Sequence, residues 1–329
     1  MRVISAISRR QRLMKLAGMK KENEKLRAEI EKSGKKFLKV ALVSSEKDMY
    51  TTTDNLLLEE AFLKKGISAK LVSWQDNEVD YKDFDGALVT TMWGYQNNLA
   101  DLQDWMRDVA KSGTPIFNSL EILKANYDKV KQFKILEKSK IGHIDTLVVK
   151  KWDDEAEEKA VKKFGFPLVV KPSISGSGEG AVLISDESEL DAAREKLTKV
   201  SPEKSLLVQP FIPEISDGEL AIILIDGKIV NTVRRFPGIF QGKFHVEVED
   251  PEMLDDRALK IVKQVRAIPE YADALYVRID LVETGGFYKV MELEYFEPQL
   301  FYYLLGTEER EAMLAAMVNG VKKRISGGK

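Results

Sequence analysis

The sequence predicts a small parallel α/β domain in the first part of the chain, followed by a larger α+β region with antiparallel strands. Three observations support this prediction. Apolar strands and helical stretches alternate, with short links, over residues 37–118. From residue 127 onward, strands follow one another in pairs that meet at glycine turns. Residues 9–36 are highly charged and have helical spacing, so a helical N-terminal extension at residues 1–36 should precede both parts.

The charged segment 9–36 carries apolar and amide side chains at heptad-like spacing. They are Leu16, Met19, Asn23, Leu26 and Ile30. An asparagine in such a seam can fix the register of a coiled coil, but two heptads are fewer than the roughly three or four usually needed. Two alternatives stay open: a solvated helix packed on the rest of the chain, and a contact between two copies in a homodimer.

The first domain is expected at residues 37–126. Its strands are predicted at 37–45, 69–74, 85–91 and 115–118, and its helices at 56–65 and 99–111. No G-x-G-x-x-G follows the first strand, so the sequence does not support a dinucleotide site there.

The α+β region is expected to form two subdomains, at residues 127–208 and 209–329. Helices are predicted at 128–138, 153–163, 187–200, 251–266 and 308–323. Strands are predicted at 146–149, 205–211, 219–226, 228–236, 274–283 and 287–295, with a strand–loop–strand at 167–184. Two of these pairs should be hairpins, because Asp226-Gly227 and Gly285-Gly286 suit tight turns.

The composition excludes several classes of function. A formal net charge of −2 gives no reason to expect nucleic acid, and no apolar run reaches the roughly 18 residues of a membrane span. The first residues contain too short an apolar stretch for a secretory signal, so a cytoplasmic protein is expected. The absence of cysteine excludes disulfides and thiol chemistry. Because His143 and His245 are the only histidines, a metal should be a hard cation held by carboxylates, such as Mg²⁺.

The stretch 167–184, PLVVKPSISGSGEGAVLI, holds a loop of small residues between two apolar strands. Backbone N–H groups of such a loop can close on phosphate oxygens, and a lysine at the end of the first strand can reach the same anion. The candidate residues are Lys171, Ser175, Gly176, Ser177, Gly178 and Gly180. The alternative is a glycine-rich hairpin with a solvated lysine.

The stretch 276–302 holds Arg-x-Asp on one strand and Glu-x-Glu on the next. Alternate residues of a strand share a face, so Arg278 and Asp280 lie together, as do Glu292 and Glu294. An arginine and three carboxylates on adjoining β surfaces are costly unless they are neutralised, which one or two magnesium ions would do. The alternative is a surface ladder of salt bridges.

A third stretch, VQPFIPEISDGE at 208–219, ends a strand in a proline turn. Its backbone, with Phe211 and Ile212, can offer an apolar slot to a purine. Glu214 or Asp217 can accept hydrogen bonds from ribose hydroxyls. Strands that end in a proline turn are common, so this signal is weak by itself.

Taken in order, these motifs resemble the ATP-grasp family over about residues 70–305. The order is a lysine after an Asn-Tyr-Asp helix start, a lysine before a small-residue loop, a hinge strand, Arg-x-Asp and Glu-x-Glu. The runs similar to the branch of cycloserine-forming and other small amino-acid ligases are 93–106 with 117–129, 217–237 and 291–301. The resemblance implies the ATP-grasp fold, in which two α+β subdomains clasp ATP.

The resemblance also implies roles for individual residues. For the nucleotide it implies Lys129, Lys171 and the loop 175–180 at the phosphates, Gln209, Phe211 and Ile212 at adenine, Glu214 at the ribose, and Glu219 near nucleotide or substrate. For the chemistry it implies Asp280, Glu292 and Glu294 as magnesium ligands, Arg278 at the acyl-phosphate and tetrahedral intermediates, and Arg235 and Glu297 on the acceptor side.

Two departures from the family pattern bear on the substrate. The strand before Trp93 usually carries an arginine, where this chain reads Val-Thr-Thr-Met at 89–92. A usual Phe-Arg pair is replaced by Phe244-His245. The family's substrate therefore does not transfer to this chain. His245 becomes a candidate proton-transfer group or phosphate donor, although a lone histidine is more often structural.

The sequence therefore predicts a Mg²⁺- and ATP-dependent ligase that joins a small carboxylate to an amine through an acyl phosphate. Its catalytic candidates are Lys171, Arg235, Arg278 and His245. Two alternatives remain: a small-molecule kinase of the same fold, and a non-catalytic nucleotide-binding or scaffold protein. The second is disfavoured because a degenerate site should lose its metal ligands first, and these are retained.

Overall fold

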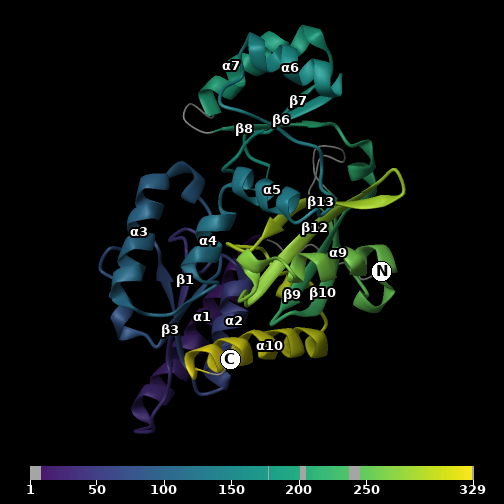
Figure 1. The fold of residues 1–329 in the computed structure, drawn as a ribbon. Helices are drawn as coiled ribbons and strands as arrows, with labels where there is room; N and C mark the ends of the chain where they lie inside the picture. The colour runs from purple at the N-terminus through teal and green to yellow at the C-terminus, as the bar shows by residue number, and fades with distance from the viewer. Residues whose placement is uncertain (1–8, 177, 201–204, 237–244, 328–329) are drawn as a thin grey trace. The chain divides into compact units, whose positions relative to one another are not determined.

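The computed structural model of the protein describes residues 9–176, 178–200, 205–236 and 245–327 (Figure 1). Ser177 and Phe244, two positions singled out above, lie outside these ranges. By its internal contacts the chain divides into two compact units. Unit 1 is Met1–Leu120 together with Glu297–Lys329, and unit 2 is Glu121–Phe296.

Unit 1 is built on a four-stranded parallel sheet with the order β2-β1-β3-β4. The strands are β1 (Lys39–Ser44), β2 (Ser68–Ser73), β3 (Gly86–Val89) and β4 (Ile116–Phe117). The helices are α1 (Arg9–Lys32), α2 (Thr53–Lys64), α3 (Leu99–Ser112) and α10 (Thr307–Ile325). The run VALV at 40–43 is fully buried, as expected for a parallel strand covered on both faces.

The C-terminal helix α10 belongs to unit 1, although the chain reaches it only after unit 2. It packs against α2 and β3 with the buried side chains Met313, Leu314, Met317, Val318 and Val321. At Gly86, the first residue of β3, an added Cβ would lie 2.9 Å from Ile325 Cδ1. The predicted subdomain 209–329 had grouped this helix with the strands before it. The contacts instead place 297–329 with the first sheet, because the apolar face of α10 is buried there.

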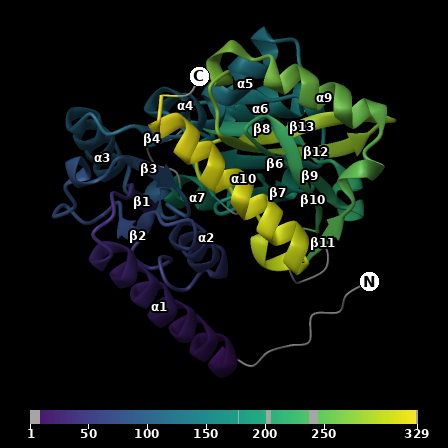
Figure 2. The ribbon, with the colours of Figure 1, turned by 90° about the horizontal axis from the view of Figure 1, so that it is seen from below.

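The heptad-like seam of α1 faces its own unit, and Figure 2 shows the helix alongside α2. Asn23 is buried and its Nδ2 donates to Glu59 Oε2 at 2.8 Å. Arg27 donates from Nε to Ala69 O at 2.7 Å and pairs through Nη2 with Glu59. Of the two alternatives left open by the sequence, the structure shows the helix packed on the rest of the chain. The homodimer contact stays a prediction.

Unit 2 contains two antiparallel sheets. The four-stranded sheet has the order β5-β8-β6-β7, with β5 (Leu147–Val149), β6 (Leu168–Pro172), β7 (Val182–Ile184) and β8 (Leu206–Pro210). The five-stranded sheet has the order β11-β10-β9-β12-β13, with β9 (Glu219–Ile225), β10 (Lys228–Phe236), β11 (His245–Glu249), β12 (Tyr276–Thr284) and β13 (Phe287–Glu294). The helices are α4 (Leu120–Asn126), α5 (Lys129–Lys138), α6 (Asp154–Phe164), α7 (Leu190–Val200) and α9 (Asp256–Arg266).

Each sheet of unit 2 has its own core. Helices α6 and α7 pack on the four-stranded sheet, where Ala160 and Val170 are fully buried. Helices α5 and α9 pack with the apolar face of the five-stranded sheet, around Ile222 and Ile279. Both predicted hairpins are confirmed: φ is positive at Asp226 and Gly227, and again at Gly285 and Gly286, as two-residue turns of this kind require.

Candidate functional site

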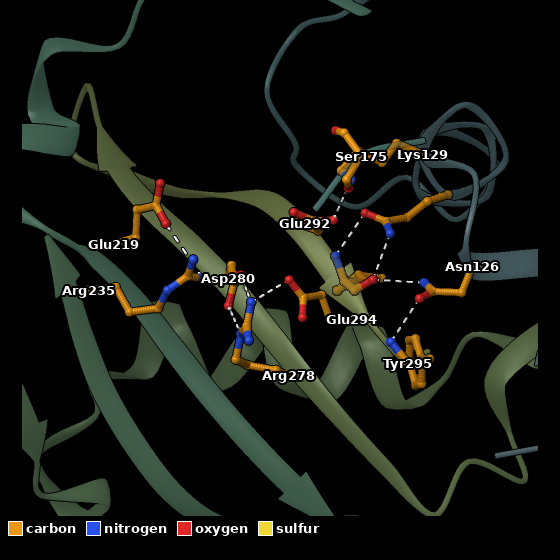
Figure 3. A network of polar contacts seen from close by, with 12 residues as sticks. Asn126, Lys129, Ser175, Glu219, Arg235, Arg278, Asp280, Glu292, Glu294 and Tyr295 are labelled. Carbon is orange, nitrogen blue, oxygen red and sulfur yellow. Dashed lines mark hydrogen bonds and ion pairs between the residues drawn. The ribbon is translucent and has the colours of Figure 1, made fainter. Parts of the chain in front are cut away.

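The charged residues gather on one face of the five-stranded sheet because side chains alternate along β12 and β13 (Figure 3). In the strand register Arg278 lies opposite Glu294, and Asp280 opposite Glu292. Arg278 and Asp280 are only 4% and 2% exposed. Ile279, between them, points the other way and is fully buried in the apolar core.

A β-bulge interrupts this register directly before the Glu-x-Glu pair. Leu281 pairs with Val290, whereas its neighbour Asp280 pairs with Glu292, so Met291 is the extra residue. Bulges bend a strand locally and re-aim the side chains that follow. The bulge therefore decides which face Glu292 occupies, and the sequence alternation alone did not reveal it.

Asp280 stands between two arginines. Arg278 donates to it twice, from Nε to Oδ1 and from Nη2 to Oδ2, each at 2.8 Å. Arg235 of β10 pairs with Oδ2 from the other side through Nη1, which also lies 3.7 Å from Glu219 Oε2. Arg278 Nη2 pairs in addition with Glu294. The arginines thus join β9, β10, β12 and β13 across one surface.

The carboxyl groups of this surface titrate differently. Burial opposes ionisation of Asp280, but Arg235 and Arg278 outweigh it and lower its pKa. Burial raises the pKa of Glu294 to about 7; Arg278 opposes the shift, and the negative charges of Glu292 and Asp280 add to it. Burial likewise raises the pKa of Glu219. Burial therefore shifts Glu219 and Glu294 toward their neutral forms, whereas the two arginines keep Asp280 ionised.

Two lysines approach the carboxylates from other elements. Lys129 begins α5, whose N-terminus is capped by Asp128. Its Nζ lies 3.1 Å from Glu292 Oε1 and donates to Ser175 O at 2.5 Å. Lys171, on β6, has its pKa lowered by burial, against which the charge of Glu292 acts. Both predicted phosphate-binding lysines thus lie near the predicted metal ligands.

Lys171 shares its face of the four-stranded sheet with Gln209, whose Nε2 donates to Thr146 Oγ1 at 2.8 Å. The same face presents apolar side chains that the sequence analysis did not single out. Its members by register are Val148, Leu207, Lys171, Gln209, Val169 and Leu183. Val148 and Leu183 are 43% and 37% exposed. The alternation of residues along each strand is evident from the sequence, but the exposure of Val148 and Leu183 is not.

The remaining predicted nucleotide residues lie around these two sheets. Phe211 and Ile212 directly follow β8, and Phe211 N donates to Pro167 O at 3.0 Å. Glu214 accepts from Thr284 Oγ1, at the end of β12, at 3.0 Å. The loop after β6 contains Gly176, Gly178 and Gly180, of which the last two have positive φ. Glu297 begins the second segment of unit 1.

The structure does not bring His245 to the charged cluster. It pairs with Phe236 in the register of β10 and β11, whereas Arg235 pairs with Val246. His245 therefore lies on the opposite face of the sheet from Arg235. Its ring stacks on Phe236, and its Nε2 lies 3.0 Å from Glu247 Oε1 with more than half of the side chain exposed. The prediction that it transfers protons has no support from this position.

The three predicted metal ligands fit a divalent cation. One oxygen from each of Asp280, Glu292 and Glu294 lies within 4.8 Å of the others, and in the described ranges no other such group of three occurs. All three donors are carboxylate oxygens, the ligand type that Mg²⁺ prefers. Burial is the main reason that the pKa of Glu294 is raised, and a cation would offset the repulsion from Glu292 and Asp280 that adds to it.

Comparison with known proteins places these features in a family. Residues 126–303 match the model of the RimK-like ATP-grasp domain, and residues 40–118 match that of the N-terminal domain of D-cycloserine synthetase DcsG. A coenzyme gamma-F420-2:alpha-L-glutamate ligase of Methanococcus maripaludis is 26% identical over 251 residues, covering 74% of this chain and 78% of that protein.

Two further curated relatives match over shorter stretches. The ligase of the same name from Methanocaldococcus jannaschii is 27% identical over 55% of this chain and 62% of its own length. A D-alanine–D-alanine ligase of Actinobacillus pleuropneumoniae is 27% identical over 45% of this chain and 50% of its own. The chain thus spans less than two thirds of these two proteins.

Solved structures show the same fold. The crystal structure of D-cycloserine synthetase DcsG superposes with a TM-score of 0.76 at 18% identity, covering 87% of this chain and 99% of that one. D-alanine–D-alanine ligase from Bacillus anthracis complexed with ATP superposes with a TM-score of 0.60 at 18% identity, covering 88% and 98%. No helix in the described part of the chain is long and apolar enough to cross a membrane. Since the ATP-grasp model matches more than half of the 329 residues, the chain belongs to the RimK-like ATP-grasp family, a family of ATP-dependent ligases.

Proposed function

We propose that this protein is a Mg²⁺-dependent ligase that uses ATP to join a small carboxylate, such as that of an amino acid, to an amine through an acyl phosphate. The observation that carries the proposal is the convergence of Asp280, Glu292 and Glu294 with two arginines and two lysines on neighbouring elements. Relatives named as a glutamate ligase and a D-alanine–D-alanine ligase support an amino acid as one substrate.

The charge balance of the cluster supports a nucleotide with its cation. Four carboxylates face four cationic side chains, so the formal charges of the cluster cancel. The members are Glu219, Asp280, Glu292 and Glu294 with Lys129, Lys171, Arg235 and Arg278. A triphosphate adds negative charge, which a divalent cation at the carboxylates would offset while the lysines turn to the phosphates.

The reaction divides into two transfers. The substrate carboxylate attacks the γ-phosphorus of ATP, ADP leaves, and an acyl phosphate forms. The amine then attacks the acyl carbon and phosphate leaves. Mg²⁺ held by Asp280, Glu292 and Glu294 would supply neutralisation of the phosphate oxygens. Lys129 and Lys171 bind the same phosphates as point charges.

Other residues of the protein have separate roles in the two transfers. Arg278, fixed by Asp280, offers guanidinium hydrogens to the oxyanion that develops at the acyl carbon. Arg235 flanks the same carboxylate, and it would contact the acceptor substrate. The glycine loop after β6 would exclude water from the acyl phosphate. Val148 and Leu183 offer exposed apolar surface for the purine beside Gln209.

The test is phosphate release from ATP and Mg²⁺ across a panel of amino acids and amines, with Lys171→Ala as control. Release that requires both a carboxylate and an amine, and that is lost in the control, supports the ligase. ADP formation with a phosphorylated product and no free phosphate indicates a kinase instead. Failure of the wild-type protein to bind ATP with Mg²⁺ overturns the proposal.

A further inference from the structure

Side chains form hydrogen bonds with the backbone at the outer edge of β13, beside the Glu-x-Glu pair. Among the described strands β13 ends its sheet, with β12 as its neighbour. Next to the site, the backbone of Leu293 is nevertheless bonded on its outer side. Gln132 of α5 accepts from Leu293 N at 2.8 Å through Oε1 and donates to Leu293 O at 2.6 Å through Nε2. This amide copies the hydrogen-bond pattern of a neighbouring strand.

A second amide extends the same contact by one step along the strand. Asn126, at the end of α4, donates from Nδ2 to Leu293 O at 2.7 Å and accepts from Tyr295 N at 2.9 Å through Oδ1 (Figure 3). Asn126 and Gln132 are 5% and 1% exposed. Together they form hydrogen bonds with three backbone groups at the strand edge, Leu293 N, Leu293 O and Tyr295 N.

The bulge at Met291 is thereby held on both sides. Before it, Val290 N donates to Gly142 O at 2.9 Å, and Val290 O accepts from Ile144 N at 3.2 Å. After it, Leu293 is held by the two amides. A slip of one residue in a strand turns every side chain to the opposite face. Holding Leu293 therefore holds Glu292 and Glu294 on the face of Asp280.

The stretch from the end of α4 into α5 also reaches the loop after β6. Lys129 lies midway between Asn126 and Gln132 in sequence, three residues from each. Its backbone N donates to Ser173 O at 3.0 Å, and its Nζ contacts Ser175 O and Glu292. One short stretch of chain therefore connects the loop after β6 with the edge of β13.

We propose that Asn126 and Gln132 are positioning residues that keep Glu292 and Glu294 in register with Asp280, so that binding of the metal with the nucleotide depends on two amides that touch neither. The proposal rests on the proposed function, because it takes these carboxylates as the metal ligands. Its consequence is specific: loss of the amides should weaken metal binding more than it weakens binding of the nucleotide alone.

The experiment uses full-length variants, with Mn²⁺ as a spectroscopic stand-in for Mg²⁺ and a non-hydrolysable ATP analogue. Gln132→Met keeps side-chain volume and removes both hydrogen bonds. Mn²⁺ affinity, measured by electron paramagnetic resonance with the analogue present, should fall about ten- to a hundredfold. Affinity for the analogue without metal should stay unchanged. In a turnover assay the Mg²⁺ concentration for half-maximal rate should rise while KM for ATP at saturating Mg²⁺ stays constant.

A matched control separates positioning from general destabilisation. Asn55 is a buried amide of unit 1 that donates to Thr91 Oγ1 at 2.7 Å and Ser44 Oγ at 3.2 Å. Asn55→Ala should lower the urea midpoint without changing Mn²⁺ affinity. If Gln132→Met does not fold, Asn126→Asp serves in its place, because it keeps the acceptor for Tyr295 N and removes the donor to Leu293 O.

The outcomes are distinguishable. A folded Gln132→Met or Asn126→Asp protein that binds Mn²⁺ as tightly as the wild type overturns the positioning role and leaves the proposed function intact. A wild-type protein that binds the analogue but never Mn²⁺ overturns the metal site, and the positioning role with it. Weakened Mn²⁺ binding in Asn55→Ala to the same extent as in Gln132→Met also contradicts the proposal.

Discussion

Asp280 owes its ionisation to two arginines from different strands. Burial alone would favour its protonated form, but Arg278 and Arg235 lower its pKa. A buried charge of this kind is tolerable only while its partners remain, since removing one partner leaves charge uncompensated. His245 lies on the opposite face of the same sheet from these residues.

Substitution on the two faces should separate their roles. Arg235→Ala removes one partner of Asp280 and should lower the rate of amine-dependent phosphate release by about a hundredfold. His245→Gln should leave that rate unchanged, because the ring is exposed beside Glu247 and faces away from Arg235. Steady-state rates of both variants, with unfolding curves to verify folding, check this. A large loss of rate in His245→Gln would instead show that the histidine takes part in the reaction.

Asp54 should make the stability of unit 1 depend on pH. Its side chain is buried in α2 and accepts from Tyr303 N at 2.9 Å, while its Oδ2 has no hydrogen-bond partner within the described ranges. Burial raises the pKa of Asp54 to about 7. The folded chain therefore holds a proton that the unfolded chain releases at much lower pH.

The sign of the effect follows from proton linkage. The stability that Asp54 contributes is present in acid, below its unfolded pKa, and is lost as pH rises toward about 7. Asp54→Asn does not titrate, so the stability of the wild type relative to the variant should fall from about pH 4 to about pH 7 and then level off. Urea midpoints of both proteins across this range measure it. Parallel curves would contradict the raised pKa.

At the scale of elements, α1 uses a polar seam to pack on its own unit. Asn23 donates to Leu56 O at 3.0 Å as well as to Glu59, whose pKa is raised by burial despite Arg27. The register expected of a coiled coil is thus fixed by an intramolecular partner. The apolar positions of such a seam look alike in sequence whichever surface covers them.

Asn23→Ala should therefore destabilise unit 1 without changing the mass of the protein in solution. Loss of a donor to the buried Glu59 carboxylate should cost about 1–3 kcal/mol of unfolding free energy. Urea unfolding measures the loss, and light scattering measures the mass. A fall in mass with little change in stability would instead assign the seam to a homodimer.

The period-two pattern was enough to predict which face carries Arg278 and Asp280, because alternation is set by the backbone. The bulge at Met291 was not predictable, since it depends on which residues of β12 and β13 pair. The face of His245 was missed for a related reason: no turn motif in the sequence fixed how the strand after 236 pairs with β10. The strand β11 and the helix α4 were not predicted either.

The amides of Asn126 and Gln132 show a second limit of prediction from the sequence. Their partners are backbone groups more than a hundred residues away, at Leu293 and Tyr295. Because these hydrogen bonds go to backbone atoms, the residue types at the two partners give no indication of the contact. The sequence shows the spacing Asn-x-x-Lys-x-x-Gln. This spacing can be interpreted only when the structure shows that it lies beside the edge of β13.

At the scale of the molecule, unit 2 is inserted into unit 1. The sequence predicted a helix at 308–323, but the residues of the helix do not indicate which strand it packs against. In the structure α10 closes over β3, where Gly86 leaves room for Ile325. The absence of a side chain at Gly86 is therefore a packing requirement set by the far end of the chain.

A double-mutant cycle tests this junction. Gly86→Ala places a Cβ 2.9 Å from Ile325 Cδ1 and should cost about 1–3 kcal/mol by overpacking. Ile325→Val deletes that methyl group, so the double variant should be more stable than the sum of the single changes predicts. Urea unfolding of the four proteins measures the coupling. Strict additivity would show that the two residues do not meet.

The return of the chain to unit 1 has a consequence for synthesis on the ribosome. Roughly 190 residues separate the end of β4 from the start of α10, so at about 5–20 residues per second the first sheet waits on the order of 10–40 s for its last helix. During that interval the surface of β3 that α10 later covers is open, because the residues of unit 2 are synthesised before α10. Nascent chains of this protein should therefore present an apolar sheet to chaperones until the final helix emerges.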